Sequence, residues 1–146
     1  MSGPGLFARM RRGLTRNRAR THPAAEDPRL RGRTYAIPFD DVWTGALWLA
    51  QRRRGWTVTL ADDQRGVLRA EAVTPVLRFV DDVEVRITLD PDGQTRVDMV
   101  SASRTGRGDL GVNPRRIARF LRALDRHLGA GPDRILDVTR RRREPA

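Results

Sequence analysis

Apolar residues recur at helical spacing in two stretches of this 146-residue chain. The first stretch follows an aspartate pair and ends at Gly55, after three consecutive arginines. Asp40 or Asp41 is expected to cap the start of this helix. The arginines suit its last turn, because cations stabilise the negative end of the helix dipole. Its apolar face comprises Val42, Trp43, Ala46, Leu47 and Ala50.

The second helical stretch starts at Asn113 and closes at Gly129. Asparagine is a common N-cap residue, and Pro114 suits the first turn because no backbone donor is needed there. The pattern predicts an amphipathic helix that buries one continuous stripe. This stripe comprises Ile117, Phe120, Leu121, Leu124 and Leu128.

Between the two predicted helices, apolar and polar residues alternate with a period of two, which is typical of half-buried strands. The clearest case is 83–89, and the DPDG sequence after it is typical of a hairpin turn. Strands are predicted at 34–38, 56–60, 67–74, 83–89 and 95–103. The order is a strand, a helix, four antiparallel strands and a helix. It predicts an α+β fold with the helices packed on one face of a curved sheet, as in TBP-like and helix-grip domains.

Composition divides the chain into three zones. We expect residues 1–33 to form a basic, mostly disordered tail, 34–128 a single domain, and 129–146 an extension ending in four arginines. The formal net charge of +11 is uneven, with +7 in the first zone, +1 over residues 34–139 and +3 in the last seven residues. The basicity therefore belongs to the tails. Nucleic-acid binding through these tails is one open interpretation.

The first zone contains a segment that would form a short amphipathic helix, favouring contact with an anionic membrane surface. The alternative is a solvated tail, because Gly13 and the short length make such a helix marginal. No apolar run suits a signal peptide or a transmembrane span, so we expect a cytoplasmic protein, with or without peripheral membrane contact. The candidate membrane-contacting residues are Leu6, Phe7, Arg9, Met10, Arg12 and Leu14.

The residue inventory argues against several kinds of chemistry. The chain has no cysteine, which excludes disulfides and thiolate metal sites. His22 and His127 lie far apart in the sequence, so we expect no metal and no cofactor. Ser101 and Ser103 share one strand face, but no histidine or lysine accompanies them as a base. A serine-nucleophile enzyme is therefore not indicated.

Two segments carry a family resemblance: TPVLRFVDDVEVRI, at 74–87, and VDMVSASRTGRGDLGVNPRRIARFLRAL, at 97–124. They resemble domain of unknown function 1499 (DUF1499), whose pattern joins R-F-x-D-D-V to S-x-S-R-x-G-x-x-D-L-G-x-N-x-x-R-I. The resemblance spans about residues 35–128, with Val80 standing where the family pattern has proline. It implies a fold and candidate residues but no reaction. Members of the DUF1499 family occur in bacteria and plastids, and they often carry a membrane anchor or an export signal.

The second motif places a glycine-rich loop before a helix N-terminus, where backbone N–H groups and the helix dipole attract anions. One interpretation is a phosphate or carboxylate site. The other is structural: Asp109 and Asn113 cap the helix while Arg104 pairs with Asp81 or Asp82. The candidate ligand-binding residues are Arg78, Asp81, Asp82, Ser101, Ser103, Arg104, Asp109, Asn113 and Arg116.

Three classes of function remain open. We favour a non-catalytic binding or scaffold domain, whose ligand would be an anion at the 104–116 loop or an apolar molecule between sheet and helix. The second class is a nucleic-acid-associated or ribosome-associated protein. The third is an enzyme with an arginine and aspartate cleft, which ranks last because no nucleophile, base or metal set accompanies these residues.

Overall fold

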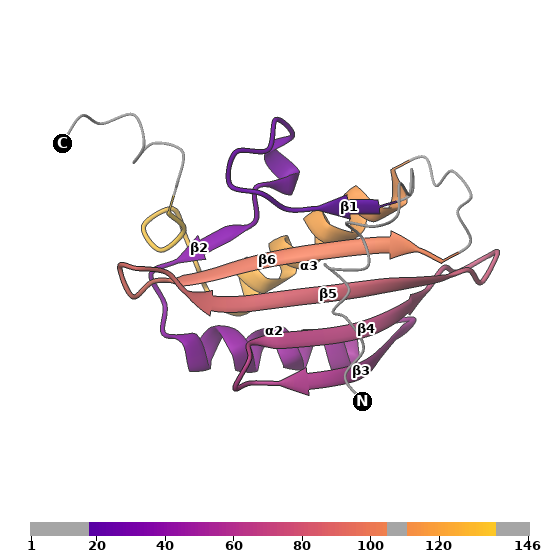
Figure 1. Cartoon of the computed structure of the whole chain (residues 1–146), viewed down its shortest axis with the longest axis horizontal. Coiled ribbons are helices and arrows are strands. Elements are labelled where there is room, and N and C mark those ends of the chain that lie inside the picture. The colour runs from indigo at the N-terminus through magenta and orange to yellow at the C-terminus, as the bar shows by residue number, and fades with distance from the viewer. Residues whose placement is uncertain (1–17, 105–110, 137–146) are drawn as a thin grey trace.

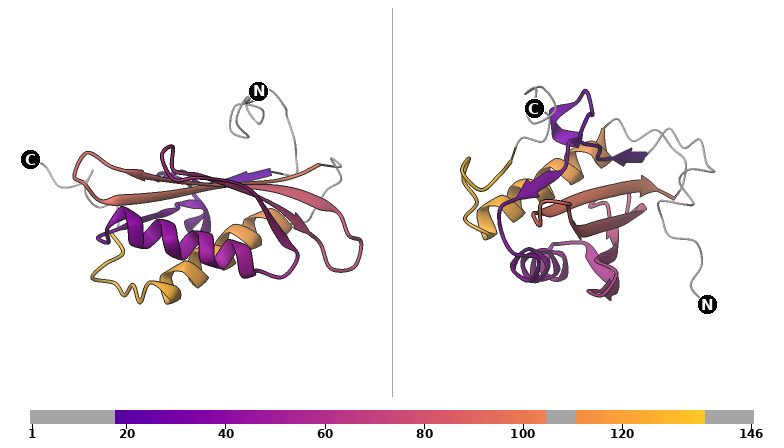
Figure 2. Two further views of the ribbon diagram at one scale, coloured as in Figure 1. Left: turned by 90° about the horizontal axis from the view of Figure 1, so that it is seen from below. Right: turned by 60° about the vertical axis from the view of Figure 1, so that its left-hand side comes forward.

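The protein folds as one open, curved, six-stranded antiparallel sheet with two helices on one face (Figures 1 and 2). The computed structural model describes residues 18–104 and 111–136. The predicted α+β class and antiparallel sheet are confirmed. The elements are β1 (Arg18–Arg20), η1 (Pro28–Leu30), β2 (Arg33–Tyr35), α2 (Phe39–Arg52), β3 (Trp56–Asp62), β4 (Val67–Val73), β5 (Val80–Leu89), β6 (Thr95–Ser103) and α3 (Val112–His127).

Strands β3 to β6 form a meander, and the sheet order is β1-β6-β5-β4-β3. The outer edge of β6 pairs with two short strands, β1 near its end and β2 near its start. Strand β3 lies at the other edge, and its register with β4 shifts between Val58 and Leu60. All of these pairings are antiparallel, as the hairpin turns in the sequence predicted.

Residues 18–33 belong to the folded unit, so the described domain begins before residue 34, where the sequence predicted its start. The Thr21 backbone N–H donates to the Met99 carbonyl at 2.9 Å, and the Thr21 hydroxyl donates to Asp98 at 2.7 Å. Strand β1 has only three residues and is held largely by backbone hydrogen bonds, so its sequence shows no hydrophobic periodicity from which a strand could be predicted. Residues 1–17, with the candidate membrane-contacting segment, and the C-terminal arginine run lie outside the described residues.

The core lies between the helices and the inner face of the sheet. In β5, Val83, Val85 and Ile87 are buried as predicted, whereas Leu89 at the end of the strand is 60% exposed. The predicted stripe of α3 is fully buried except for Leu128, which is half-buried. Trp56 stacks on Phe120 with 5.3 Å between ring centroids, which joins β3 to α3. The largest fully buried apolar residues of the two layers are Val42, Leu68, Val83, Val85, Ile87, Met99, Ile117, Phe120, Leu121 and Leu124.

Both helices begin slightly earlier than predicted. Helix α2 starts at Phe39, so Asp40 and Asp41 lie inside its first turn, where they complement the helix dipole instead of capping it. Helix α3 starts at Val112 after Gly111, which has a left-handed φ of 91°. Asn113 is therefore not the N-cap residue. Its buried side chain reaches the sheet, because β6 offers hydroxyl partners there.

Strand β2 connects the sheet to α3 and to the end of the chain. The buried Tyr35 hydroxyl donates to Asp125 at 2.5 Å, and the Arg33 guanidinium lies 3.0 Å from the same carboxylate. Burial, followed by the Asp125 hydrogen bond, raises the pKa of Tyr35 far above its usual range. Residues 134–136 then pair with β2 through backbone bonds such as Leu136 N–H to Thr34 O at 2.8 Å. The described part of the predicted extension thus docks on the domain.

The β3–β4 turn requires glycine at position 66. Gly66 has a φ of 66°, and an added Cβ would lie 1.9 Å from the Ile87 carbonyl oxygen. We expect Gly66→Ala to lower the free energy of unfolding by about 3 kcal/mol or more, through strain and a backbone clash. Gly93→Ala, at φ 75° with open space around the added atom, should cost only about 1 kcal/mol. Urea unfolding measures both, and equal losses would contradict the clash.

Candidate functional site

The two segments that carry the family pattern meet at one end of the sheet, where β5 begins and β6 ends. Asp81 pairs in register with Ser103, and Val83 pairs with Ser101. Because strand side chains alternate, Asp81, Ser101 and Ser103 all lie on the face that α3 covers. The first turns of α3 place Asn113 against Ser101 and Arg116 against Asp81.

Arg116 is the centre of this buried polar network. Its Nη2 lies 2.7 Å from Asp81 Oδ2, and only 11% of the Arg116 side chain and 2% of the Asp81 side chain are exposed. Its Nη1 donates to Ser101 Oγ at 3.1 Å and to Asn113 Oδ1 at 2.8 Å. The amide of Asn113 also donates to Ser103 Oγ at 3.2 Å. These mutual bonds satisfy the buried polar groups and fix the start of α3 on the sheet.

Arg104 and Asp82 lie on the opposite face of the sheet. Arg104 Nη2 lies 2.8 Å from Asp82 and 2.7 Å from Glu71, and about half of its side chain is exposed. The hydrogen bonds that Arg104 donates to Asp82, and then the one that it donates to Glu71, raise the pKa of Arg104. From the sequence, Arg104 is expected to pair with Asp81 or Asp82, and the pair with Asp82 is confirmed. The adjacent Asp81 and Asp82 do not share a site, since they point to opposite faces.

The remaining candidates do not join the network. Arg78 is exposed in the β4–β5 turn with a positive φ of 54°, and Asp81 pairs with Arg116 instead. Asp109 lies outside the described residues. Within residues 18–104 and 111–136, no group of three acidic or histidine side chains could hold a metal ion. The buried residues of the motif thus connect the sheet to α3.

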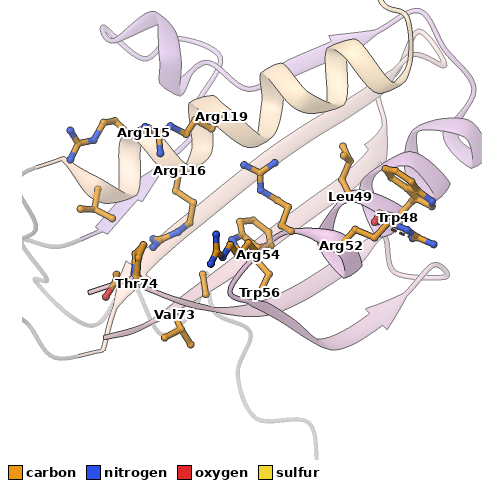
Figure 3. Close-up of a pocket in the computed structure, with 14 residues that line it drawn as sticks. Trp48, Leu49, Arg52, Arg54, Trp56, Val73, Thr74, Arg115, Arg116 and Arg119 are labelled. Carbon is orange, nitrogen blue, oxygen red and sulfur yellow. Dashed lines mark hydrogen bonds between the residues drawn. The ribbon is translucent and has the colours of Figure 1, made fainter. Parts of the chain in front are cut away.

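A pocket of about 860 Å³ opens beside the network, between the end of α2, the start of α3, and strands β3 and β4. Figure 3 shows arginines of α3 on one side of the pocket, arginines at the end of α2 on the other, and Trp56 between them. Six of the fourteen lining residues are arginine and none is acidic. The six are Arg52, Arg53, Arg54, Arg115, Arg116 and Arg119.

The cations of the pocket are supported by aromatic rings more than by carboxylates. In the part of the chain that the structure describes, Arg116 alone of the six forms an ion pair. The Arg53 guanidinium lies 5.5 Å from the Trp56 ring centroid, and that of Arg52 lies 4.4 Å from the Trp48 ring centroid. Burial, and then the charge of Arg119, lower the pKa of Arg53. The pocket thus holds a concentrated positive charge.

Sequence reasoning missed this pocket. It assigned the Arg52–Arg54 run to the helix dipole and interpreted Arg116 only as part of a site at the loop before the helix. One signal was present, since five of the sixteen residues of α3 are arginine and only Asp125 is acidic. The arginine content of α3 does not show that the start of α3 lies beside the end of α2, because that arrangement depends on tertiary packing.

Comparisons with known proteins agree with the motif. The model of the family described as "Protein of unknown function (DUF1499)" matches residues 14–124. This range reaches from before β1 into the last turns of α3, so it includes the strands, the network and all fourteen residues that line the pocket. No curated protein matches the chain. None of the described helices is long and apolar enough to cross a bilayer.

The network generates a stability prediction. Arg116→Met would leave the Asp81 carboxylate buried without its cation, and we expect a loss of about 3–5 kcal/mol in the free energy of unfolding. Adding Asp81→Asn should recover part of this loss, because the unpaired charge is then removed. Urea unfolding at constant m-value measures each step.

The matched control is Arg104→Met, which breaks a half-exposed pair and should cost about 1 kcal/mol or less. If Arg104→Met is as damaging as Arg116→Met, or if the double variant recovers nothing, the network does not hold α3 in the way described.

Proposed function

Because the chain belongs to the DUF1499 family, which is defined without an activity, we propose a function from its geometry: it is a non-catalytic binding domain for a small anionic molecule. The ligand would carry a phosphate or carboxylate group beside an apolar or aromatic portion. The arginine-lined pocket between α2 and α3 is the site that supports this proposal best.

The observation that carries the proposal is the imbalance of charge in the pocket. Six arginines line it without a single acidic residue, and only Arg116 has a carboxylate partner among the described residues. Gathering unpaired cations in a half-enclosed space costs free energy, which an anionic ligand would relieve. The guanidinium group also binds phosphate or carboxylate through two parallel hydrogen bonds.

Two further features favour a small anion with an apolar part. Val112, the first residue of α3, lines the pocket, so the positive end of the helix dipole faces it. The rest of the lining is largely apolar and includes Trp48, Leu49 and Trp56. A ring or a short acyl chain would fit against these side chains while its charged group meets the arginines.

The lining favours binding over catalysis. It contains no histidine, aspartate or glutamate, and Thr74 supplies its only hydroxyl group. That hydroxyl already accepts a hydrogen bond from the Phe79 N–H at 2.9 Å. General acid–base chemistry needs a titratable group near the ligand, and arginine stays protonated at physiological pH. An enzyme therefore has less support than a binding domain.

The test uses the full chain, with phenyl phosphate and inorganic phosphate as probes in calorimetric titrations. We expect phenyl phosphate to bind more tightly, since its ring would contact the tryptophans. The double variant Arg53→Gln/Arg119→Gln removes two unpaired cations and should weaken phenyl phosphate binding by about 30-fold or more. Quenching of tryptophan fluorescence gives a second readout, because Trp48 and Trp56 line the pocket.

The matched control is Arg122→Gln/Arg134→Gln, which removes the same net charge from positions outside the pocket. It should leave the affinity within about twofold of the native value, because screened charges at a distance contribute little. If both double variants lose the same affinity for phenyl phosphate, net charge and not the pocket explains the binding. Absence of binding by both probes would overturn the proposal.

A further inference from the structure

The β4–β5 connection carries the most exposed apolar side chains of the described residues. Val76 is 88% exposed and Leu77 is 70% exposed, and both follow the exposed Pro75. Arg78 completes the tip, which we define as residues 75–78. Pro75, Val76 and Leu77 are contiguous in the chain, and contiguous exposed apolar surface marks sites of contact with proteins or membranes.

The tip is held in a defined shape. The Thr74 N–H donates to the Phe79 carbonyl at 2.9 Å, and the Phe79 N–H donates to the Thr74 hydroxyl at 2.9 Å. These two bonds close the base of the turn, and Pro75 restricts the backbone on its first side. Arg78 has a positive φ of 54°, the only such non-glycine residue among those described. The apolar side chains are therefore presented without a large ordering cost on binding.

The surroundings of the tip are basic. Thr74 and Pro75 line the rim of the arginine pocket, so the tip and the pocket share one end of the molecule. Arg54 and Arg115 are exposed at this end, and Arg78 lies within the tip itself. No acidic residue occurs between Ala72 and Val80. Two apolar side chains beside several cations match an anionic membrane, where apolar groups enter the acyl region and cations meet phosphates.

We propose that the 75–78 tip is a membrane-contacting element that inserts Val76 and Leu77 into an anionic lipid surface. The tip is too small to be the core of a stable protein interface, which buries roughly 800 Å² on each partner. A bilayer needs no such area, because each inserted side chain and each nearby arginine adds independently to the affinity. This inference does not depend on which anion fills the pocket.

The absence of cysteine allows a direct test with the full chain. Leu77→Cys and Leu89→Cys are each labelled with acrylodan, whose emission shifts to the blue in an apolar environment. Leu89 is 60% exposed at the opposite end of β5 and serves as the matched control. Vesicles containing phosphatidylglycerol should shift the probe at position 77 and not at position 89. Phosphatidylcholine vesicles should shift neither.

A second pair of variants measures affinity. Val76→Ser/Leu77→Ser should weaken binding to phosphatidylglycerol vesicles by about tenfold or more, whereas Leu60→Ser/Leu89→Ser, which changes exposed residues elsewhere, should not. Binding of phenyl phosphate should be unchanged in both, which separates failure of the tip from failure of the pocket.

Other outcomes would overturn the proposal. Native vesicle binding by the Val76→Ser/Leu77→Ser variant would place the membrane contact elsewhere in the chain. If that variant instead dissociates an oligomer, measured by light scattering, the tip is covered by a second copy of the protein. If neither probe shifts with any vesicle, the tip does not enter a bilayer.

Discussion

The contact between Arg116 and Asp81 determines how α3 is placed on the sheet. Both groups are withdrawn from water, so their charges must meet each other, and Ser101 and Asn113 complete the bonding of Arg116. Because both buried charges must keep their pairing and hydrogen bonds, α3 is held in one position and one orientation on the sheet. Once α3 is fixed in this way, Arg115 and Arg119 are brought to the pocket together with it. The structural motif and the arginine-lined pocket are thus two results of one interaction.

The chain contains 29 arginines and no lysine, and the structure shows two roles that suit the guanidinium group. A flat guanidinium group stacks on tryptophan, as Arg52 does on Trp48, and forms several directed hydrogen bonds at once, as Arg116 does. Elsewhere the same residue type balances carboxylates across the open face of the sheet. There Arg69 and Arg86 both contact Glu84, which is fully buried. Arginine therefore supports the sheet on one face and charges the pocket on the other.

Much of the fold could be predicted because its signals are local. The alternation along β5 and the stripe of α3 each follow from burial on one face, because buried positions are mostly occupied by apolar residues. The predicted cap at Asn113 was wrong because a long-range partner on β6 outweighs the local preference. Strand β1 was missed because backbone bonds, which any residue can make, hold it. The pocket was missed because it needs two helix ends that are far apart in the sequence.

The register shift between Val58 and Leu60 has a consequence for how copies of the protein meet in solution. Strand β3 is the outer strand of the sheet on the side away from β1, and a straight outer strand presents a regular row of backbone donors and acceptors to any neighbour. The shift interrupts that row in its middle. Growth of the sheet from molecule to molecule is thereby disfavoured, even though Leu60 remains partly exposed beside the interruption. This irregularity protects the protein against edge-to-edge aggregation.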